Sequence, residues 1–243
     1  TPFRQDDGTL LFRPAGHGAL IENLNEIDAT GVHQEHRQRT TDALRGDTIR
    51  YKKVLAGILL DLQERAFEYL KALEVGGAEL EPIVEFIEKR LCVKLPGSYD
   101  SAVLRAVLDR PIRVCGMVRN EGEPGGGPFW VGNPTARSRS DRRIEPDQPD
   151  DLPLMRSATH FNPVDLVCGM KNSKGVRFDA QVHRSFDGFH FVESSGGRDL
   201  RAQELPGLWN GAMAKWNTVF VDVPITTFSP VKVVQDLLRP QHQ

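Results

Sequence analysis

A short glycine turn near the start of the chain is the first stretch that could bind a ligand. Gly16, His17 and Gly18 lie between a short apolar run at 10–12 and a helical pattern at 19–27. Glycines let the backbone approach a flat ligand closely, and free N–H groups at a helix N-terminus can bind an anion or a base edge. A plain strand-to-helix turn needs the same residues, because short glycine motifs are weak predictors by themselves. We predict a nucleotide- or sugar-binding turn and keep the plain turn as the alternative.

Two other loops carry residues suited to a sugar or a phosphate. Three consecutive glycines, which include Gly126 and Gly127, have a proline on either side, so their backbone could lie against a ligand. Asn162 precedes an apolar run and offers both a donor and an acceptor to a sugar hydroxyl. The alternatives are a plain surface loop for the glycines and a strand-entry cap for Asn162.

Lys232 is the candidate catalytic side chain. It follows Pro230 at the start of an apolar stretch. A lysine held at the start of an element can place a point charge on a phosphate. A solvated surface lysine is the alternative.

Four histidines invite a metal site, but we assign none. His33 and His36 are three positions apart, and His183 and His190 are conceivable partners. Zinc sites need ligand spacing that is held by structure. Residues 30–43 have no hydrophobic period, so the sequence predicts a loop there instead of a held ligand pair.

Alternating elements must position these residues, and the alternation favours an α/β fold. The clearest helix covers 48–73, with Asp47 as its predicted N-cap and Gly76 as its stop. Residues 133–153 are predicted to be an irregular loop like 30–43, and 183–196 are ambiguous. Further helices are expected at 19–27, 79–91, 98–108 and 231–238, and strands at 111–118, 129–131, 163–170 and 218–223.

Composition limits the classes of function. The net charge is −2, which argues against a nucleic-acid-binding protein that relies on a strong positive field. No apolar run approaches the roughly 20 residues that span a bilayer, so we expect no membrane segment. The three cysteines are widely separated and fit no paired pattern, which predicts buried thiols in a cytoplasmic protein. The oligomeric state is not predicted.

Four long stretches together resemble a bacterial family, the domain of unknown function family 4301. They are residues 10–27, 111–131, 159–169 and 205–239. The run L-P-G-L-W-N-G-A-M at 205–213 is too specific to be generic. The chain therefore resembles this family over most of its length.

That family is in turn similar to UTP-dependent sugar-1-phosphate uridylyltransferases. The turn at 14–18 resembles their P-G-H-G-D motif with Ala19 in place of the Asp, and 126–129 resembles G-G-T-L. Residues 223–238 resemble V-P-R-S-R-F-L-P-V-K-x-x-x-D-L-L. The resemblance implies a partial GT-A-like, Rossmann-related sheet flanked by helices, with His17 at the uracil or sugar and Lys232 at phosphate. It also implies a nucleotide or sugar phosphate as partner, and Mg²⁺ for the full-length relative.

Two departures make this chain look like an incomplete, inactive C-terminal portion. The glycine-rich triphosphate loop of such enzymes lies upstream of the turn at 14–18 and is not found here. Where relatives have V-F-I-K-N-I-D-N-V, with a metal-binding Asp, residues 31–39 read G-V-H-Q-E-H-R-Q-R. The string GGTGTTCATCAAGAACATCGACAACGT encodes the second peptide, and without its first base it encodes the first. We hypothesise that residues 30–41, 134–146 and 189–193 are out-of-frame translations, which the source DNA would test.

Three functions stay open at this point. The chain could be part of a catalytic nucleotidyltransferase, a nucleotide- or sugar-binding module without catalysis, or a structural α/β domain. An upstream glycine-rich loop would favour catalysis over plain binding. Titration with nucleotides separates both from a structural role.

Overall fold

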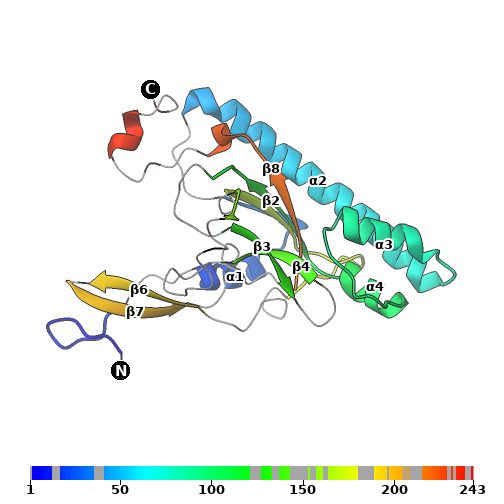
Figure 1. Cartoon of the computed structure of the whole chain (residues 1–243), viewed down its shortest axis with the longest axis horizontal. Coiled ribbons are helices and arrows are strands. Elements are labelled where there is room, and N and C mark those ends of the chain that lie inside the picture. The colour runs from blue at the N-terminus through cyan, green and yellow to red at the C-terminus, as the bar shows by residue number, and fades with distance from the viewer. Residues whose placement is uncertain are drawn as a thin grey trace.

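A mixed sheet with helices on both faces forms the body of the computed structural model (Figure 1). The structure describes residues 2–12, 17–35, 41–120, 127–132, 137–142, 153, 157–160, 164–179, 189–195, 197–204, 207, 215–228, 231, 234–238 and 242. The helices are α1 (His17–Glu26), α2 (Asp42–Val75), α3 (Leu80–Lys89), α4 (Ser101–Leu108) and the 3-10 turns η1 (Ile225–Thr227) and η2 (Val234–Leu238). The strands are β1 (Gly31–Glu35), β2 (Ile112–Met117), β3 (Gly127–Gly132), β4 (Arg137–Arg142), β5 (Asp165–Gly169), β6 (Phe189–Ser195), β7 (Arg198–Glu204) and β8 (Asn217–Asp222).

The four-stranded sheet has the order β1-β5-β2-β8. β2 and β8 are parallel, with Val114 beside Val219, while β5 runs antiparallel to both β1 and β2. Since β5 is antiparallel to each of its neighbours, β1, β2 and β8 all run in one direction. The predicted α/β class is confirmed, with a mixed sheet flanked by helices.

Side chains alternate between two buried clusters on the two faces of the sheet. On one face, Val114 and Val167 belong to the cluster of the α2 leucines. On the other face, Cys115 and Leu166 pack with Ile21 of α1. α2 and α1 therefore cover opposite faces of the same strands.

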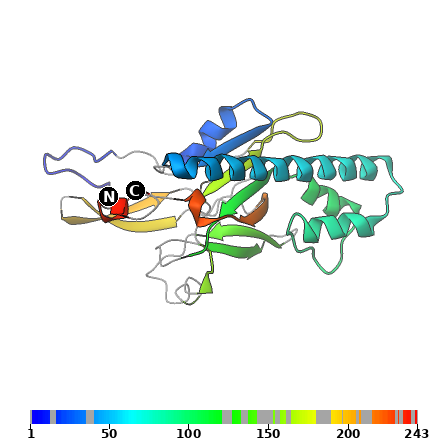
Figure 2. The same ribbon diagram turned by 90° about the horizontal axis from the view of Figure 1, so that it is seen from above.

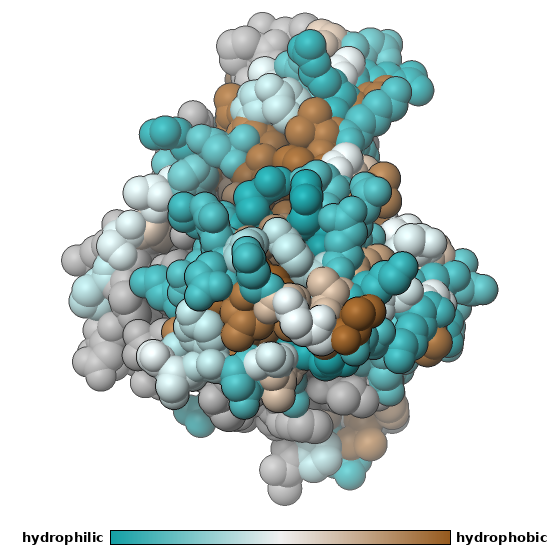
Figure 3. Space-filling view, turned by 90° about the vertical axis from the view of Figure 1, so that its right-hand side faces the viewer, coloured by the Kyte–Doolittle hydropathy of each residue, from teal (hydrophilic) through white to brown (hydrophobic). Residues whose placement is uncertain are grey.

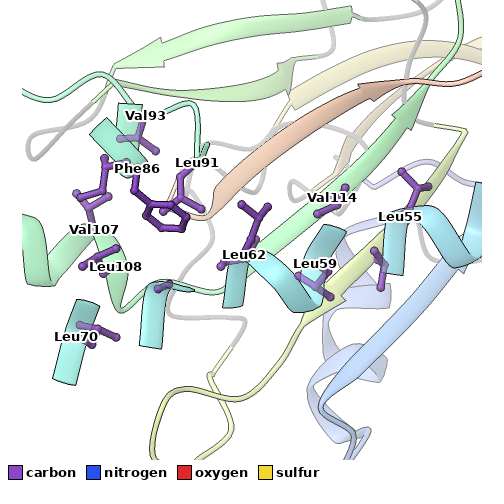
Figure 4. Close-up of a cluster of buried hydrophobic side chains, with 14 of the residues drawn as sticks. Leu55, Leu59, Leu62, Leu70, Phe86, Leu91, Val93, Val107, Leu108 and Val114 are labelled. Carbon is purple, nitrogen blue, oxygen red and sulfur yellow. The ribbon is translucent and has the colours of Figure 1, made fainter. Parts of the chain in front are cut away.

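α2 is a long helix that lies along the sheet (Figure 2). Figure 4 shows Leu55, Leu59 and Leu62 of α2 beside Val114 of β2. Side chains pack directly on the backbone of Gly116, where an added Cβ would lie 3.2 Å from the Leu55 side chain and 3.4 Å from the Val223 side chain. As predicted, Gly76 ends the helix in a conformation with φ of 84°, which favours glycine.

The loop predicted for 30–43 is wrong at both of its ends. Residues 31–35 form β1, and α2 begins at Asp42, so Asp47 lies inside the helix instead of capping it. β1 is an edge strand, and its pairing with β5 uses main-chain groups only, so a polar segment can occupy this place. Asp47 instead accepts a hydrogen bond from the Thr226 hydroxyl at 2.9 Å.

The loop predicted for 133–153 also contains a strand. β4 pairs with β3 in an antiparallel hairpin, from Gly127 opposite Arg142 to Gly132 opposite Arg137. Its sequence R-S-R-S-D-R is polar throughout, which suggested a linker. However, its arginines and serines alternate with the period of two that suits a strand. The ambiguous stretch 183–196 likewise contains β6, which pairs with β7.

Two of the three cysteines are buried as predicted, and one is not. Cys115 and Cys168 lie in the α1-facing cluster, whereas Cys92 is partly exposed in a turn after α3. Burial raises the pKa of the Cys168 thiol, although the nearby Arg113 guanidinium opposes the shift. Cys168 is therefore a protonated, inert core thiol.

The α3–α4 end of the molecule shows a mostly hydrophilic surface with hydrophobic areas between polar side chains (Figure 3). α3 and α4 pack against each other and close the core beyond the sheet with Phe86, Ile87 and Leu104. Among the helices that the structure describes, none is long and apolar enough to cross a membrane.

Candidate functional site

Three parallel strands end at one edge of the sheet, which we call the carboxyl edge and define by Glu35, Met117 and Asp222. The register of β1, β5 and β2 aligns Glu35 with Asp165 and Gly116 across the sheet, and Met117 pairs with Asp222. In open α/β sheets, ligands bind outside the carboxyl ends of the strands. This edge is therefore the first place to look for a site.

α2 begins beyond the carboxyl edge and runs back along the sheet, antiparallel to β2. Leu55 contacts the Cβ position of Gly116 near the end of β2, and Gln63 lies against Gly169, which pairs with the first residue of β2. The bond from Thr226 to Asp47 also ties the first turns of α2 to the segment that follows β8. The first turns of α2 therefore extend past this edge, by about 20 Å from the level of Leu55 to the start of the helix.

α1 is oriented the same way on the opposite face. Past its C-terminal end, Asp28 pairs with Lys171 at 3.0 Å, and Asn25 in its last turn donates to Asp179 at 3.2 Å. Both partners follow β5 at the far edge of the sheet. A ten-residue helix spans about 15 Å, so His17 lies toward the carboxyl edge.

A polar cluster occupies the carboxyl ends of β2 and β8. Arg119, just past β2, forms a β-bridge with His160, and the amide of Asn120 donates to the Thr159 carbonyl at 3.1 Å. The Thr159 hydroxyl lies 2.9 Å from His160 Nδ1. His160 Nε2 lies 3.7 Å from Asp222 Oδ1 at the end of β8. Three segments far apart in sequence therefore bring a guanidinium, an imidazole and a carboxylate to one edge.

Arg119 is the cation of this cluster that faces solvent. Its side chain is exposed, and no ion pair within the described part of the chain engages its guanidinium. A guanidinium presents a planar fork of donors that matches phosphate. The end of β2 can therefore bind an anion directly.

Most of the predicted site residues cannot be placed. Gly16, Gly126, Asn162 and Lys232 lie outside the described residues, so their predicted roles stay predictions.

The other three predicted residues belong to regular elements. His17 opens α1, Gly18 is buried in its first turn, and Gly127 begins β3. Two described residues near Asn162 are held beside β2. His160 forms a β-bridge with Arg119, and the Val164 amide donates to the Gly116 carbonyl at 2.9 Å.

Metal binding receives no support from the described residues. Within them, no group of three or more histidine, cysteine, aspartate or glutamate side chains could hold a metal ion. His33 and His190 lie in the strands β1 and β6, while His36 and His183 are outside the description. The described carboxylates at the carboxyl edge form no such group.

A groove of about 730 Å³ lies at the opposite end of the sheet from this cluster. Its walls are the C-terminal half of α2, Thr30 before β1 and the turn after β5, and they contain none of the predicted site residues. Acidic and basic side chains mix there, and Glu74 lies 3.7 Å from Lys174. Its lining includes three glutamates and two lysines, so the groove offers no excess of positive charge for a phosphate.

The fold and the cluster define an α/β protein whose candidate site lies at the carboxyl ends of parallel strands. The chain belongs to the family described as Domain of unknown function (DUF4301), whose sequence model matches residues 1–243, and the predicted family is thereby confirmed. No curated protein matches the chain by sequence.

Among solved structures, the chain is similar to a variant of UDP-glucose pyrophosphorylase from Leishmania major in complex with UDP-glucose. The TM-score is 0.38 and the sequence identity is 18%. The match covers 60% of this chain and 34% of the pyrophosphorylase chain, so this chain spans about a third of that protein's length.

Proposed function

We propose that the carboxyl edge binds a sugar nucleotide or its phosphorylated parts, and that the chain forms part of a nucleotidyltransferase-like domain. One observation carries the proposal: Arg119 lies at the carboxyl ends of the same parallel strands toward which the N-terminal end of α1 is directed. Each of these groups favours an anion. The order of the motif-like stretches along the chain supports the nucleotide class.

The reaction that fits this class is transfer of a uridylyl group from UTP to a sugar 1-phosphate. An oxygen of the sugar phosphate attacks the α-phosphate in line, and pyrophosphate leaves. Phosphoryl transfer depends on positioning and on stabilising negative charge. In this chain Arg119 would bind phosphate, the turn at His17 and Gly18 would hold the base or sugar, and Lys232 would contact phosphate.

Isothermal titration with UTP, UDP, UDP-glucose and inorganic phosphate tests the proposal. We expect saturable binding of the uridine nucleotides with a one-to-one stoichiometry, at concentrations where phosphate alone gives weaker heat. Binding should weaken as salt rises, because ion pairs with phosphate are screened. Absence of heat with every nucleotide, with and without Mg²⁺, would refute the proposed function and favour a structural domain.

A further inference from the structure

We propose that His160 and Asp222 together hold a hydroxyl group of the sugar ring, which orients the ligand with its phosphates toward Arg119. This inference rests on the proposed function and names a subsite within it. The two side chains come from different segments, since His160 precedes β5 and Asp222 ends β8. Sequence patterns do not bring them together; the fold does.

The spacing of the pair leaves room for a shared partner. The 3.7 Å between His160 Nε2 and Asp222 Oδ1 exceeds a good hydrogen bond. The imidazole is 24% exposed and the carboxylate 58% exposed, so a ligand can reach both. A group that binds one of them can therefore bind the other at the same time.

The hydrogen-bond chain around His160 indicates which kind of group fits. If the Thr159 hydroxyl donates to Nδ1 across their 2.9 Å contact, the neutral ring carries its proton on Nε2 and turns a donor toward Asp222. The opposite tautomer would turn a lone pair toward a carboxylate, which is repulsive. The pair then offers one donor and one acceptor side by side. A hydroxyl, which accepts and donates at once, satisfies both.

Charge decides against a phosphate at this position. Asp222 is a carboxylate with no guanidinium or ammonium within ion-pair distance in the described residues, and it repels a phosphate. Arg119 lies two residues past Met117, the β2 residue that pairs with Asp222. The cluster is therefore divided into a cationic side for phosphate and a neutral-to-acidic side for hydroxyls. A sugar nucleotide carries both kinds of group, because its phosphates are bonded directly to a sugar ring with several hydroxyls.

Comparing UDP with UDP-sugars by titration calorimetry tests the subsite. The panel is UDP, UDP-glucose, UDP-galactose and UDP-N-acetylglucosamine against the wild-type chain and Asp222→Ala. We expect at least one UDP-sugar to bind the wild type about 10-fold more tightly than UDP, as one good hydrogen bond to a charged group allows. In Asp222→Ala that gain should disappear, while UDP binds as well as before or more tightly because a negative charge is gone.

Two further variants separate recognition from structure. His160→Gln keeps a polar side chain. It should lose part of the extra affinity for the UDP-sugar without changing the affinity for UDP. Asp28→Ala removes an exposed carboxylate paired with Lys171 at the far edge and should change neither ligand. Thermal unfolding checks that each variant is folded, and Asp222→Asn replaces Asp222→Ala if the latter is not.

The outcomes distinguish this inference from the proposed function. If the wild type binds UDP and every UDP-sugar equally, or if Asp222→Ala and Asp222→Asn weaken both kinds of ligand alike, the hydroxyl subsite is refuted and nucleotide binding stands. If no nucleotide binds the wild type, both are refuted. A sugar gain that the Asp222 variants leave intact also refutes the subsite.

Discussion

Replacing Leu59 by Ala is expected to lower the free energy of unfolding by about 2–5 kcal/mol. Leu59 is 2% exposed and belongs to the cluster between α2 and the sheet. Its side chain also lies 3.7 Å from the Cβ position of Gly31, where β1 joins the sheet. Truncation leaves a cavity beside Gly31, which has no side chain to fill it. The backbone of β1 cannot move into the cavity because it is held by its pairing with β5. Urea unfolding followed by circular dichroism measures the loss.

The adjacent residue is a matched control. Leu60 is the same residue type one position further along α2, but it is 59% exposed. Leu60→Ala should change the free energy of unfolding by no more than about 0.5 kcal/mol, as surface substitutions usually do. Equal effects at the two positions would mean that α2 does not pack on the sheet through the face described above.

Arg119→Ala is expected to weaken binding of UDP about 10- to 100-fold, the second large effect. A charge-assisted hydrogen bond to phosphate contributes about 1.5–3 kcal/mol, and each 1.4 kcal/mol is a factor of ten in affinity. Arg119→Lys keeps the charge but loses the planar fork, so its affinity should lie between the two. Calorimetry with UDP and thermal unfolding of each variant give the affinity and the fold.

An arginine at the far end of α2 is the control for this substitution. Arg65 is also exposed, and its partner Glu68 lies 3.7 Å away on the same helix, beside the groove and away from the carboxyl edge. Arg65→Ala should leave UDP binding unchanged. If Arg65→Ala and Arg119→Ala weaken UDP binding equally, the affinity depends on the overall charge of the protein. In that case the carboxyl edge has no special role.

Elements with buried side chains could be predicted from the sequence. β2 and β5 are buried at every position and read as short apolar runs, as expected for sheet interiors. α2 carries its buried leucines at helical spacing over about five turns, from Leu55 to Leu73. Their bounds were correct to within a few residues, except that α2 starts six residues earlier than predicted. Polar residues in its first turns hid that start.

Elements stabilised by main-chain pairing could not be predicted in the same way. β1 and β4 have polar sequences, and only the strands beside them, β5 and β3, supply the hydrogen bonds that make them strands. Hydrophobic periodicity carries no signal for such segments. The same limit explains why the sequence predicts a loop at 31–35.

The candidate site shows a related limit. The motif at 159–162 predicts a role for Asn162, because an amide can both donate to and accept from a hydroxyl. The structure instead pairs His160 with Asp222, which ends β8. The one signal available was that polar residues follow β2 and β8 where buried strands end. Their proximity depends on β2 and β8 being parallel neighbours.

Hydrogen exchange measured with and without the tightest-binding UDP-sugar tests the central claim most directly. If the carboxyl edge is the binding site, exchange should slow in peptides that cover 17–22, 119–120, 157–160 and 222–228, which lie at that edge. Peptides covering 60–74 and 171–176, at the groove on the other side, should exchange as before. Slowing confined to the groove peptides, or no slowing at saturating ligand, would contradict the account.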